Sequence, residues 1–335
     1  MTQENRPIVG LVMGDAAGIG PEITVKAAVR PEVHRVCRLL VIGDARVIAA
    51  AARRFEVSAA VHAVGSPAEA SSTPERISVL DLHNLPPEDV VLGQLSAAAA
   101  RAALEAISRG RRLAESGEIQ ALVWAPINKQ ALHMVHYEEP GLKHLLEEMM
   151  QDESAQRMVQ VGPLRIFGVT PHVALRRACD MITKERVLET IRLAHTTLRR
   201  LGFERPRIGV AALNPHGGEG GLFGREEIEE IGPAVETACR EGLAVWGPIP
   251  GDTIFVRAKN GEFDACIAMY HDQTTMPPKL LGFGSGVSMP LGSPYPTVTT
   301  AHGTAFDIAG KGVANPQSLI DALLMAARMA ESGRE

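Results

Sequence analysis

Short apolar runs alternate with longer stretches of helical pattern along this 335-residue chain, and no other feature constrains the fold as strongly. Short apolar runs between turn residues are typical of buried strands. The predicted strands are Ile8–Met13, Leu39–Ile42, Ile77–Leu80, Ala121–Trp124, Arg165–Val169, Ile208–Ala212 and Ala265–Met269. The predicted helices are Pro21–Val29, Gly93–Ser116, Leu142–Met150, Lys184–Leu201, Glu226–Glu241 and Pro316–Ser332. This alternation predicts an α/β fold with a largely parallel sheet covered by helices.

Length and composition narrow the class of protein further. A chain of this length favours two lobes, since one domain usually holds roughly 150 residues. The apolar share of 45% and charged share of 22% are ordinary for a globular protein and argue against disorder or a fibre. The net charge of −5 and the aromatic share of 4% argue against nucleic-acid binding.

Five of the predicted strands lead directly into polar side chains. These strand ends are Gly14-Asp15, Asn128-Lys129, Thr170-Pro171-His172, Asn214-Pro215-His216 and Tyr270-His271-Asp272. Parallel strands end at the same edge of a sheet, and ligands of open α/β sheets bind at that edge. The sequence therefore predicts one shared cleft.

Three histidines, His172, His216 and His271, each follow a predicted strand. Neutral imidazoles bind borderline divalent metals, and three such ligands leave a coordination position open for catalysis. His172 and His216 also follow a proline, whose fixed φ stiffens the turn. A helix-capping or core role is the alternative for each histidine, but their shared setting favours a common metal site.

Three glycine-rich segments stand beside these strand ends. The segment 14–22 opens a helix, with a proline and a glutamate in the first turn. Its glycine spacing matches neither the dinucleotide-binding motif GxGxxG nor a Walker A loop. The glycines therefore indicate only that the backbone comes close to another group, which is either a ligand or the neighbouring backbone in a tight strand–helix turn. The segment 216–224 has five glycines in nine residues, which favours a binding loop. The segment 302–316 is either a plain surface loop or a holder for a flat polar ligand such as adenine.

Several segments resemble one enzyme family. They are GDAAGIGPEI, APINKQAL, TPHVAL, LNPHGGEGGLFGREE, GPIPGDTIF, YHDQ and HGTAFDIAGKG. In this order they resemble motifs of the 4-hydroxythreonine-4-phosphate dehydrogenase family of pyridoxine biosynthesis, and the first and last also resemble the wider isocitrate and isopropylmalate dehydrogenase superfamily. They extend from residue 14 to residue 316, so the resemblance covers nearly the whole chain.

The resemblance implies a fold and an activity. The fold is a two-lobed α/β/α homodimer with the active site in the interdomain cleft. We expect the first lobe over residues 1–130 and 300–335, and the second over residues 131–299. The activity is NAD-dependent oxidation of a secondary alcohol on a small-molecule substrate, with decarboxylation of the product. A divalent metal, most often zinc, chelates the alcohol and lowers its pKa.

The resemblance also assigns roles to individual residues. The metal ligands are His172, His216 and His271, with one of the three coming from the partner subunit. Asp252 and Asp272 match acidic residues near the metal, and Lys279 matches a substrate-binding lysine. The adenosine part of NAD is expected on the loop that contains His302, Gly303, Thr304, Asp307 and Asn315.

Departures from the family pattern concern the substrate. Members with phosphorylated substrates carry Gly-His-Thr-Glu where this chain has Gly141-Leu142-Lys143-His144, and an Asn and an Arg where it has Ser288 and Thr297. Phosphate recognition uses a bidentate arginine or several strong donors. We therefore expect Lys143, His144, Ser288 and Thr297 to form a pocket for an unphosphorylated substrate. The expected substrate is an aromatic cis-dihydrodiol carboxylate such as terephthalate 1,2-cis-dihydrodiol, in aromatic catabolism. The alternatives are 4-hydroxythreonine 4-phosphate and a sugar-acid phosphate.

Two other classes compete with a dehydrogenase. A metal-dependent hydrolase or aldolase would use the same histidines but would need no adenosine loop, and a ligand sensor would not need to keep the metal ligands. No apolar run approaches the roughly 20 residues that cross a bilayer, the N-terminal segment is not a secretory signal, and the 4 cysteines form no CxxC pair. We expect a cytoplasmic enzyme that binds neither membranes nor nucleic acid.

Overall fold

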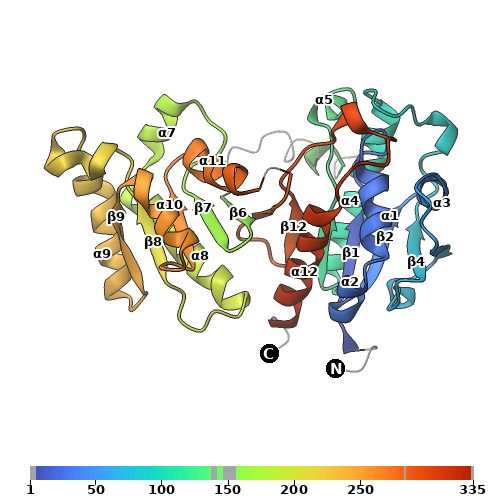
Figure 1. Cartoon of the computed structure of the whole chain (residues 1–335), viewed down its shortest axis with the longest axis horizontal. Coiled ribbons are helices and arrows are strands. Elements are labelled where there is room, and N and C mark those ends of the chain that lie inside the picture. The colour runs from blue at the N-terminus through green and yellow to red at the C-terminus, as the bar shows by residue number, and fades with distance from the viewer. Residues whose placement is uncertain (1–4, 137–141, 146–155, 283, 333–335) are drawn as a thin grey trace. The chain divides into compact units, whose positions relative to one another are not determined.

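The computed structural model describes residues 5–136, 142–145, 156–282 and 284–332. The chain divides into two compact units, and most of their helices and strands are labelled in Figure 1. Unit 1 consists of Met1–Gln151 and Ser293–Glu335, and unit 2 consists of Asp152–Gly292.

The unit boundaries differ from the sequence-based expectation of breaks after residues 130 and 299. Ala131, Leu132 and Val135 are buried in the hydrophobic core of unit 1, as are Leu142 and Leu145. Their apolar side chains keep the segment beyond residue 130 with unit 1, because burial of apolar area is the main favourable term in packing.

In the part of unit 1 that the structure describes, parallel strands lie in the order β3-β4-β2-β1-β5-β12. Their bounds are Ile8–Val12 (β1), Arg38–Gly43 (β2), Ala60–Val64 (β3), Arg76–Asp81 (β4), Ala121–Trp124 (β5) and Thr297–Thr300 (β12). Strands β1 and β5, and β2 after Arg38, contain no polar side chain, because a parallel sheet is covered on both faces.

The helices of unit 1 whose bounds the structure describes are α1 (Gly20–Ala28), α2 (Pro31–Val36), α3 (Ala45–Arg54), α4 (Ala97–Glu115), α5 (Lys129–Leu132) and α12 (Gln317–Ser332). Residues 142–145 of the predicted helix Leu142–Met150 are helical, and its remainder lies outside the described residues. Helix α4 is rich in alanine, the residue with the highest helix propensity, and the Ser96 side chain caps its N-terminus by accepting the Ala99 N–H. Its buried face includes Leu104 and Ile107, which pack in the core of unit 1 with Leu122 of β5. Short 3₁₀ turns lie at Pro67–Glu69 (η2), Pro87–Asp89 (η3) and Phe306–Ile308 (η6).

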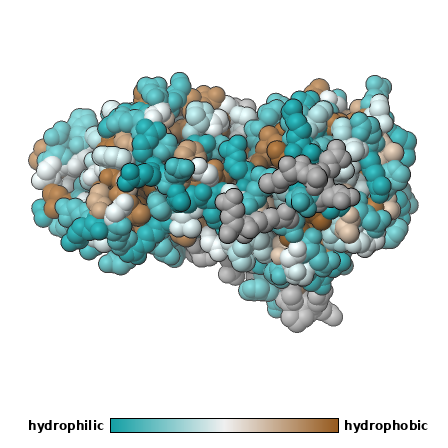
Figure 2. Space-filling view, turned by 90° about the horizontal axis from the view of Figure 1, so that it is seen from below, coloured by the Kyte–Doolittle hydropathy of each residue, from teal (hydrophilic) through white to brown (hydrophobic). Residues whose placement is uncertain are grey.

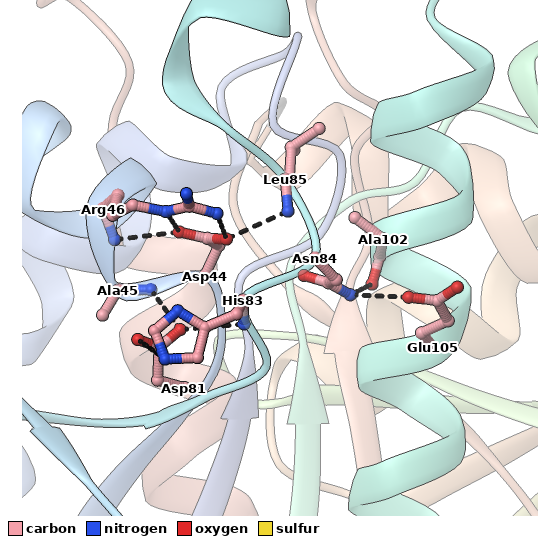
Figure 3. A network of polar contacts seen from close by, with 9 residues as sticks. All are labelled: Asp44, Ala45, Arg46, Asp81, His83, Asn84, Leu85, Ala102 and Glu105. Atoms are coloured by element: carbon pink, nitrogen blue, oxygen red, sulfur yellow. Dashed lines mark hydrogen bonds and ion pairs between the residues drawn. The ribbon is translucent and has the colours of Figure 1, made fainter.

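A polar network joins the ends of β2 and β4 to the loop that follows them (Figure 3). Asp44 is fully buried and accepts hydrogen bonds from the Arg46 guanidinium at 2.7 and 3.0 Å and from the Leu85 N–H at 2.9 Å. Burial alone would raise the pKa of Asp44, but these hydrogen bonds hold it below its ordinary value. Asp81 accepts the N–H groups of Ala45 and His83. The network satisfies the orphan donors at the start of α3, which is a structural role.

Unit 2 contains strands in the order β11-β6-β7-β10-β8-β9. Their bounds are Arg157–Val161 (β6), Leu164–Gly168 (β7), Ile208–Ala211 (β8), Val245–Ile249 (β9), Ala265–Ala268 (β10) and Val287–Pro290 (β11). The strands from β7 to β9 are parallel, whereas β6 pairs antiparallel with both β7 and β11. The core includes Ile166, Ile254 and Cys266.

The helices of unit 2 are α7 (Leu175–Met181), α8 (Lys184–Arg200), α9 (Gly232–Arg240), α10 (Gly251–Lys259) and α11 (His271–Leu281). A 3₁₀ segment, η4 (Pro215–Gly221), and a π-helical turn, η5 (Glu227–Ile231), connect β8 to α9. The expected mixed α/β fold is therefore confirmed, with a parallel set of strands in each unit.

Hydrophilic and apolar residues are mixed on the face shown in Figure 2, as on a typical protein surface. Among the residues that the structure describes, none of the helices has both the length and the apolarity needed to cross a membrane.

Candidate active site

Two of the predicted metal ligands meet at the carboxyl ends of β7 and β10. These strands are parallel neighbours, so His172 and His271, which follow them, reach the same edge of the sheet. The Thr170 hydroxyl donates to the Met269 carbonyl at 2.9 Å and joins the two strand ends. The ring centroids of His172 and His271 lie 4.8 Å apart. This pairing agrees with the expectation from the strand ends.

A pocket of about 510 Å³ opens beside these two histidines. This volume lies within the range of small-molecule sites. Its walls come from the turn after β7, the start of α7 and the start of α11. The lining residues are Pro171, His172, Val173, Ala174, Leu175, Arg177, Ala178, Tyr270, His271 and Asp272.

Asp272 orients one of the two imidazoles. Its Oδ1 lies 2.8 Å from His271 Nδ1, a contact that fixes which ring nitrogen faces away from the carboxylate. A carboxylate behind an imidazole is a common device for orienting a metal ligand. Asp252, the other predicted acidic residue, is the second residue of α10 and is exposed.

His216 lies on the glycine-rich loop after β8 and is exposed. Residues 216–220 all have positive φ, between 45° and 80°, and His216 itself has φ 53°. Such angles are costly for residues other than glycine, so other contacts must hold this loop in place. His216 Nδ1 lies 3.2 Å from Glu219 Oε1.

The contacts that hold this loop come from Glu227, which the sequence analysis did not identify. Glu227 is only 5% exposed. Its Oε1 accepts the N–H groups of Leu213 and Asn214 at 2.8 and 2.7 Å, and its Oε2 accepts the Asn214 side-chain amide at 2.9 Å. In the sequence Glu227 stands in an acidic run that resembles an exposed helix face. Only the helical spacing to the buried Ile231 hints at burial.

This edge of the sheet offers suitable donors for a divalent metal, but the described residues of one chain do not form a complete set of ligands. The paired imidazoles of His172 and His271 border open space and suit a borderline metal. Among the described residues, no three histidine, cysteine or acidic side chains gather closely enough to hold an ion. The three-histidine site stays a prediction, and the family resemblance itself expects one ligand from a partner subunit.

The predicted substrate residues of unit 2, Lys279 and Ser288, do not line this pocket. Lys279 is exposed on α11, eight residues beyond His271, and is not among the lining residues. Ser288 is buried on β11 and Thr297 on β12. Lys143 and His144 are exposed in unit 1, and Gly141 lies outside the described residues.

The predicted adenosine loop belongs to unit 1 and is tied to helix α1. Lys26 Nζ donates to the carbonyls of Gly312 and Ala314 at 2.8 and 3.0 Å. Glu22 Oε1 accepts from Lys26 and from the Ala314 N–H at 2.7 and 2.9 Å. Arg54 of α3 donates to the Gly310 carbonyl at 3.2 Å. The loop is therefore a fixed structure rather than a loose connection.

The proposed cofactor residues occupy distinct places on this loop. Thr304 accepts the Ile19 N–H on its carbonyl at 3.0 Å, and its hydroxyl lies 3.4 Å from the Asn128 side chain. His302 contacts the Gly303 carbonyl, and Asp307 is exposed in η6. Asn315 Oδ1 accepts the Gln317 N–H at the start of α12. Their role in cofactor binding stays a prediction.

Asp15, three residues beyond the end of β1, is a fully buried carboxyl whose Oδ1 accepts the Ala17 N–H at 2.9 Å. Burial raises the pKa of Asp15 from 3.8 to about 6. The folded state thus binds a proton more tightly than the unfolded chain, and the stability that Asp15 contributes is lost as the pH rises from about 4 through 6.

We expect Asp15→Asn to remove this pH dependence, because its side chain stays neutral. The variant should gain up to about 3 kcal/mol relative to the parent between pH 4 and pH 8, since each pKa unit corresponds to about 1.4 kcal/mol. Urea unfolding across this range measures the difference, and parallel stability curves for the two proteins would contradict the expectation.

The fold and the donors at the strand ends define an α/β enzyme with its chemistry at the carboxyl edge of a parallel sheet. The family described as "Pyridoxal phosphate biosynthetic protein PdxA" matches residues 35–326. The chain belongs to this family.

Two close relatives carry named activities. The D-threonate 4-phosphate dehydrogenase of Cupriavidus necator is 43% identical over 325 residues, which cover 97% of each chain. The crystal structure of 4-hydroxythreonine-4-phosphate dehydrogenase from Klebsiella pneumoniae superposes with a TM-score of 0.84 at 37% identity, covering 97% of this chain and 98% of that one. The prediction of an enzyme of the dehydrogenase class is confirmed.

The predicted aromatic dihydrodiol substrate is wrong. The terephthalate 1,2-cis-dihydrodiol dehydrogenase of Burkholderia xenovorans is only 31% identical, with a TM-score of 0.66, although 98% of this chain is covered. The more similar relatives are named for phosphorylated substrates. The physical error was to infer the absence of phosphate from missing donors at a few positions, because donors elsewhere in a pocket serve the same purpose.

Proposed function

We propose that this protein is a D-threonate 4-phosphate dehydrogenase that uses NAD and a divalent metal, with zinc as the expected ion. The observation that carries the proposal is the 43% identity to the Cupriavidus enzyme over 97% of both chains. This substrate has a carboxylate at C1, hydroxyls at C2 and C3, and a phosphate ester at C4. Oxidation at C3 gives a β-keto acid, which loses CO₂ to give a three-carbon hydroxyketone phosphate.

The bound metal would stabilise negative charge on substrate oxygens, and NAD would accept the hydride. His172, His216 and His271 would hold the metal, with one of the three coming from the partner subunit, and Asp272 orients His271 through its 2.8 Å contact. The pocket beside them would hold the substrate. The loop that Glu22 and Lys26 hold in place would bind the adenosine part of NAD.

A second candidate substrate is 4-hydroxythreonine 4-phosphate, which the name of the 37% identical Klebsiella structure favours. The two compounds share the carboxylate, the C3 hydroxyl and the phosphate. They differ at C2, which carries a hydroxyl in one and an ammonium group in the other. A homodimer also belongs to the proposal, since a partner subunit would supply the missing metal ligand.

The purified protein, supplied with zinc and NAD, is expected to form NADH and CO₂ in equal amounts from D-threonate 4-phosphate. The measurement is NADH absorbance together with CO₂ capture, with 4-hydroxythreonine 4-phosphate offered in parallel. Higher kcat/KM for the first compound supports the proposal, and higher kcat/KM for the second would favour the second candidate. Absence of NADH with both compounds would overturn the dehydrogenase assignment.

A further inference from the structure

The pocket beside His172 and His271 contains one strongly basic wall residue. Among the described residues that line it, Arg177 is the only lysine or arginine. The remaining wall consists of His172, His271, Tyr270 and Asp272, together with small or apolar residues of the turn before α7 and of α7 itself. Arg177 is thus the side chain of this pocket that best suits a phosphate group.

The chemistry of arginine fits a phosphate ester. A guanidinium is charged at every accessible pH, and its planar N–H donors match two phosphate oxygens at once. Arg177 is the third residue of α7 and is exposed, so an incoming ligand can reach its side chain. Its neighbour Arg176 is equally exposed but does not line the pocket, and the two form a matched pair for comparison.

The other basic residue predicted for the substrate lies farther along the same unit. Lys279 is separated from His271 by eight positions of α11, which is about 12 Å of helix rise. Ser288 is buried on β11. Neither residue lines the pocket.

We propose that Arg177 binds the phosphate group of the substrate and thereby selects phosphorylated over unphosphorylated hydroxy acids. This inference rests on the proposed function, because it assigns the phosphate to the pocket of His172 and His271. The apolar side chains of Val173 and Leu175 would then contact the carbon chain beside the phosphate. The inference also explains how the protein could bind a phosphorylated substrate although Leu142, Ser288 and Thr297 stand where other family members carry phosphate-binding residues.

The test compares Arg177→Gln, Arg177→Lys and the matched control Arg176→Gln. We expect Arg177→Gln to raise the KM for D-threonate 4-phosphate by about 10- to 100-fold, since a charge-assisted pair is lost, and to change kcat by less than about threefold. Arg177→Lys should have an intermediate KM because it keeps the charge but loses the planar fork. Arg176→Gln should stay within about twofold of the parent.

A binding measurement without turnover separates this inference from the proposed function. Calorimetric titration of the zinc-loaded protein with inorganic phosphate should give a Kd that Arg177→Gln weakens by a similar factor and Arg176→Gln does not. D-threonate, which lacks the phosphate, should bind parent and Arg177→Gln equally. Thermal unfolding of each variant checks that the fold is intact.

Two results would overturn the role of Arg177. One is an unchanged KM and phosphate Kd in Arg177→Gln, and the other is a loss of kcat with KM unchanged. A parent protein that binds phosphate through Arg177 but oxidises neither phosphorylated compound would support the anion site and contradict the proposed function.

Discussion

Replacing His172 with alanine is expected to lower kcat/KM by about 1000-fold or more. His172 and His271 lie 4.8 Å apart beside the pocket, and loss of one imidazole leaves too few ligands to hold a divalent ion there. A site that stabilises charge electrostatically loses most of its effect when the ion is gone. NADH formation measures the activity, and elemental analysis of the dialysed protein measures the bound metal, which should fall with it.

The matched control is His62→Ala, which removes an exposed imidazole from the edge strand β3 of unit 1. This variant should keep both its activity and its metal. Parent-like kcat/KM and metal content in His172→Ala would show that the paired histidines are not the metal centre, whereas an unfolded His172→Ala protein would be recognised by its circular dichroism. His271→Ala then provides the second variant of the pair.

Replacing Glu227 with alanine is expected to have the second-largest effect, about 100-fold in kcat/KM with a loss of about 3 kcal/mol of stability. The substitution removes the acceptor of the Leu213 and Asn214 N–H groups, and each buried donor that loses its partner costs about 1–3 kcal/mol. Those two bonds hold the start of the loop in which His216 has φ 53°. Without them the loop relaxes and the imidazole of His216 loses its place.

Two further variants test the Glu227 prediction, one conservative substitution and one control. Glu227→Gln keeps a carbonyl oxygen for the two N–H groups and should recover part of both losses. Glu236→Ala removes an exposed carboxylate from α9 and should change neither activity nor stability measurably. Urea unfolding and kcat/KM are measured on all three, and a Glu227→Ala protein with parent-like values in both would refute the positioning role.

Strand ends were the most predictable part of this protein. The predicted strands at Arg165–Val169, Ile208–Ala212 and Ala265–Met269 contain β7, β8 and β10 apart from small differences at the ends. Parallel strands that are buried on both faces leave a plain apolar signal in the sequence. The residues after them are placed by chain direction alone, and this is why His172 and His271 could be expected to meet.

Other elements gave no such signal. Strands β11 (VSMP) and β12 (TVTT) contain hydroxyl residues or proline instead of a continuous apolar run. In β6, apolar and polar residues are mixed, and the strand forms an antiparallel hairpin with β7 through the turn at Gly162. A pattern search based on apolar runs misses such strands. The boundary between the two compact units also differs from the predicted one, because the burial of Leu132 and its neighbours depends on three-dimensional packing that the local pattern does not contain.

The candidate site shows the same limit. Glu227 and Arg177 are charged residues in charged segments, and only the folded structure shows that Glu227 is buried and that Arg177 lines the pocket. The substrate prediction failed for a related reason, since a pocket is defined by all of its walls and the sequence motifs describe only some of them.

The hydrogen bonds between α1 and the loop at residues 310–314 have a consequence for engineering. Lys26 and Glu22 hold Gly312 and Ala314 through three hydrogen bonds and also pair with each other, although nearly the whole chain separates α1 from the loop in sequence. In chimeras between this protein and its relatives, segments 20–28 and 310–314 should be inherited from the same parent. A crossover point between these two segments would combine an α1 helix from one parent with a loop from the other. The hydrogen bonds between them would then depend on residues that did not evolve together.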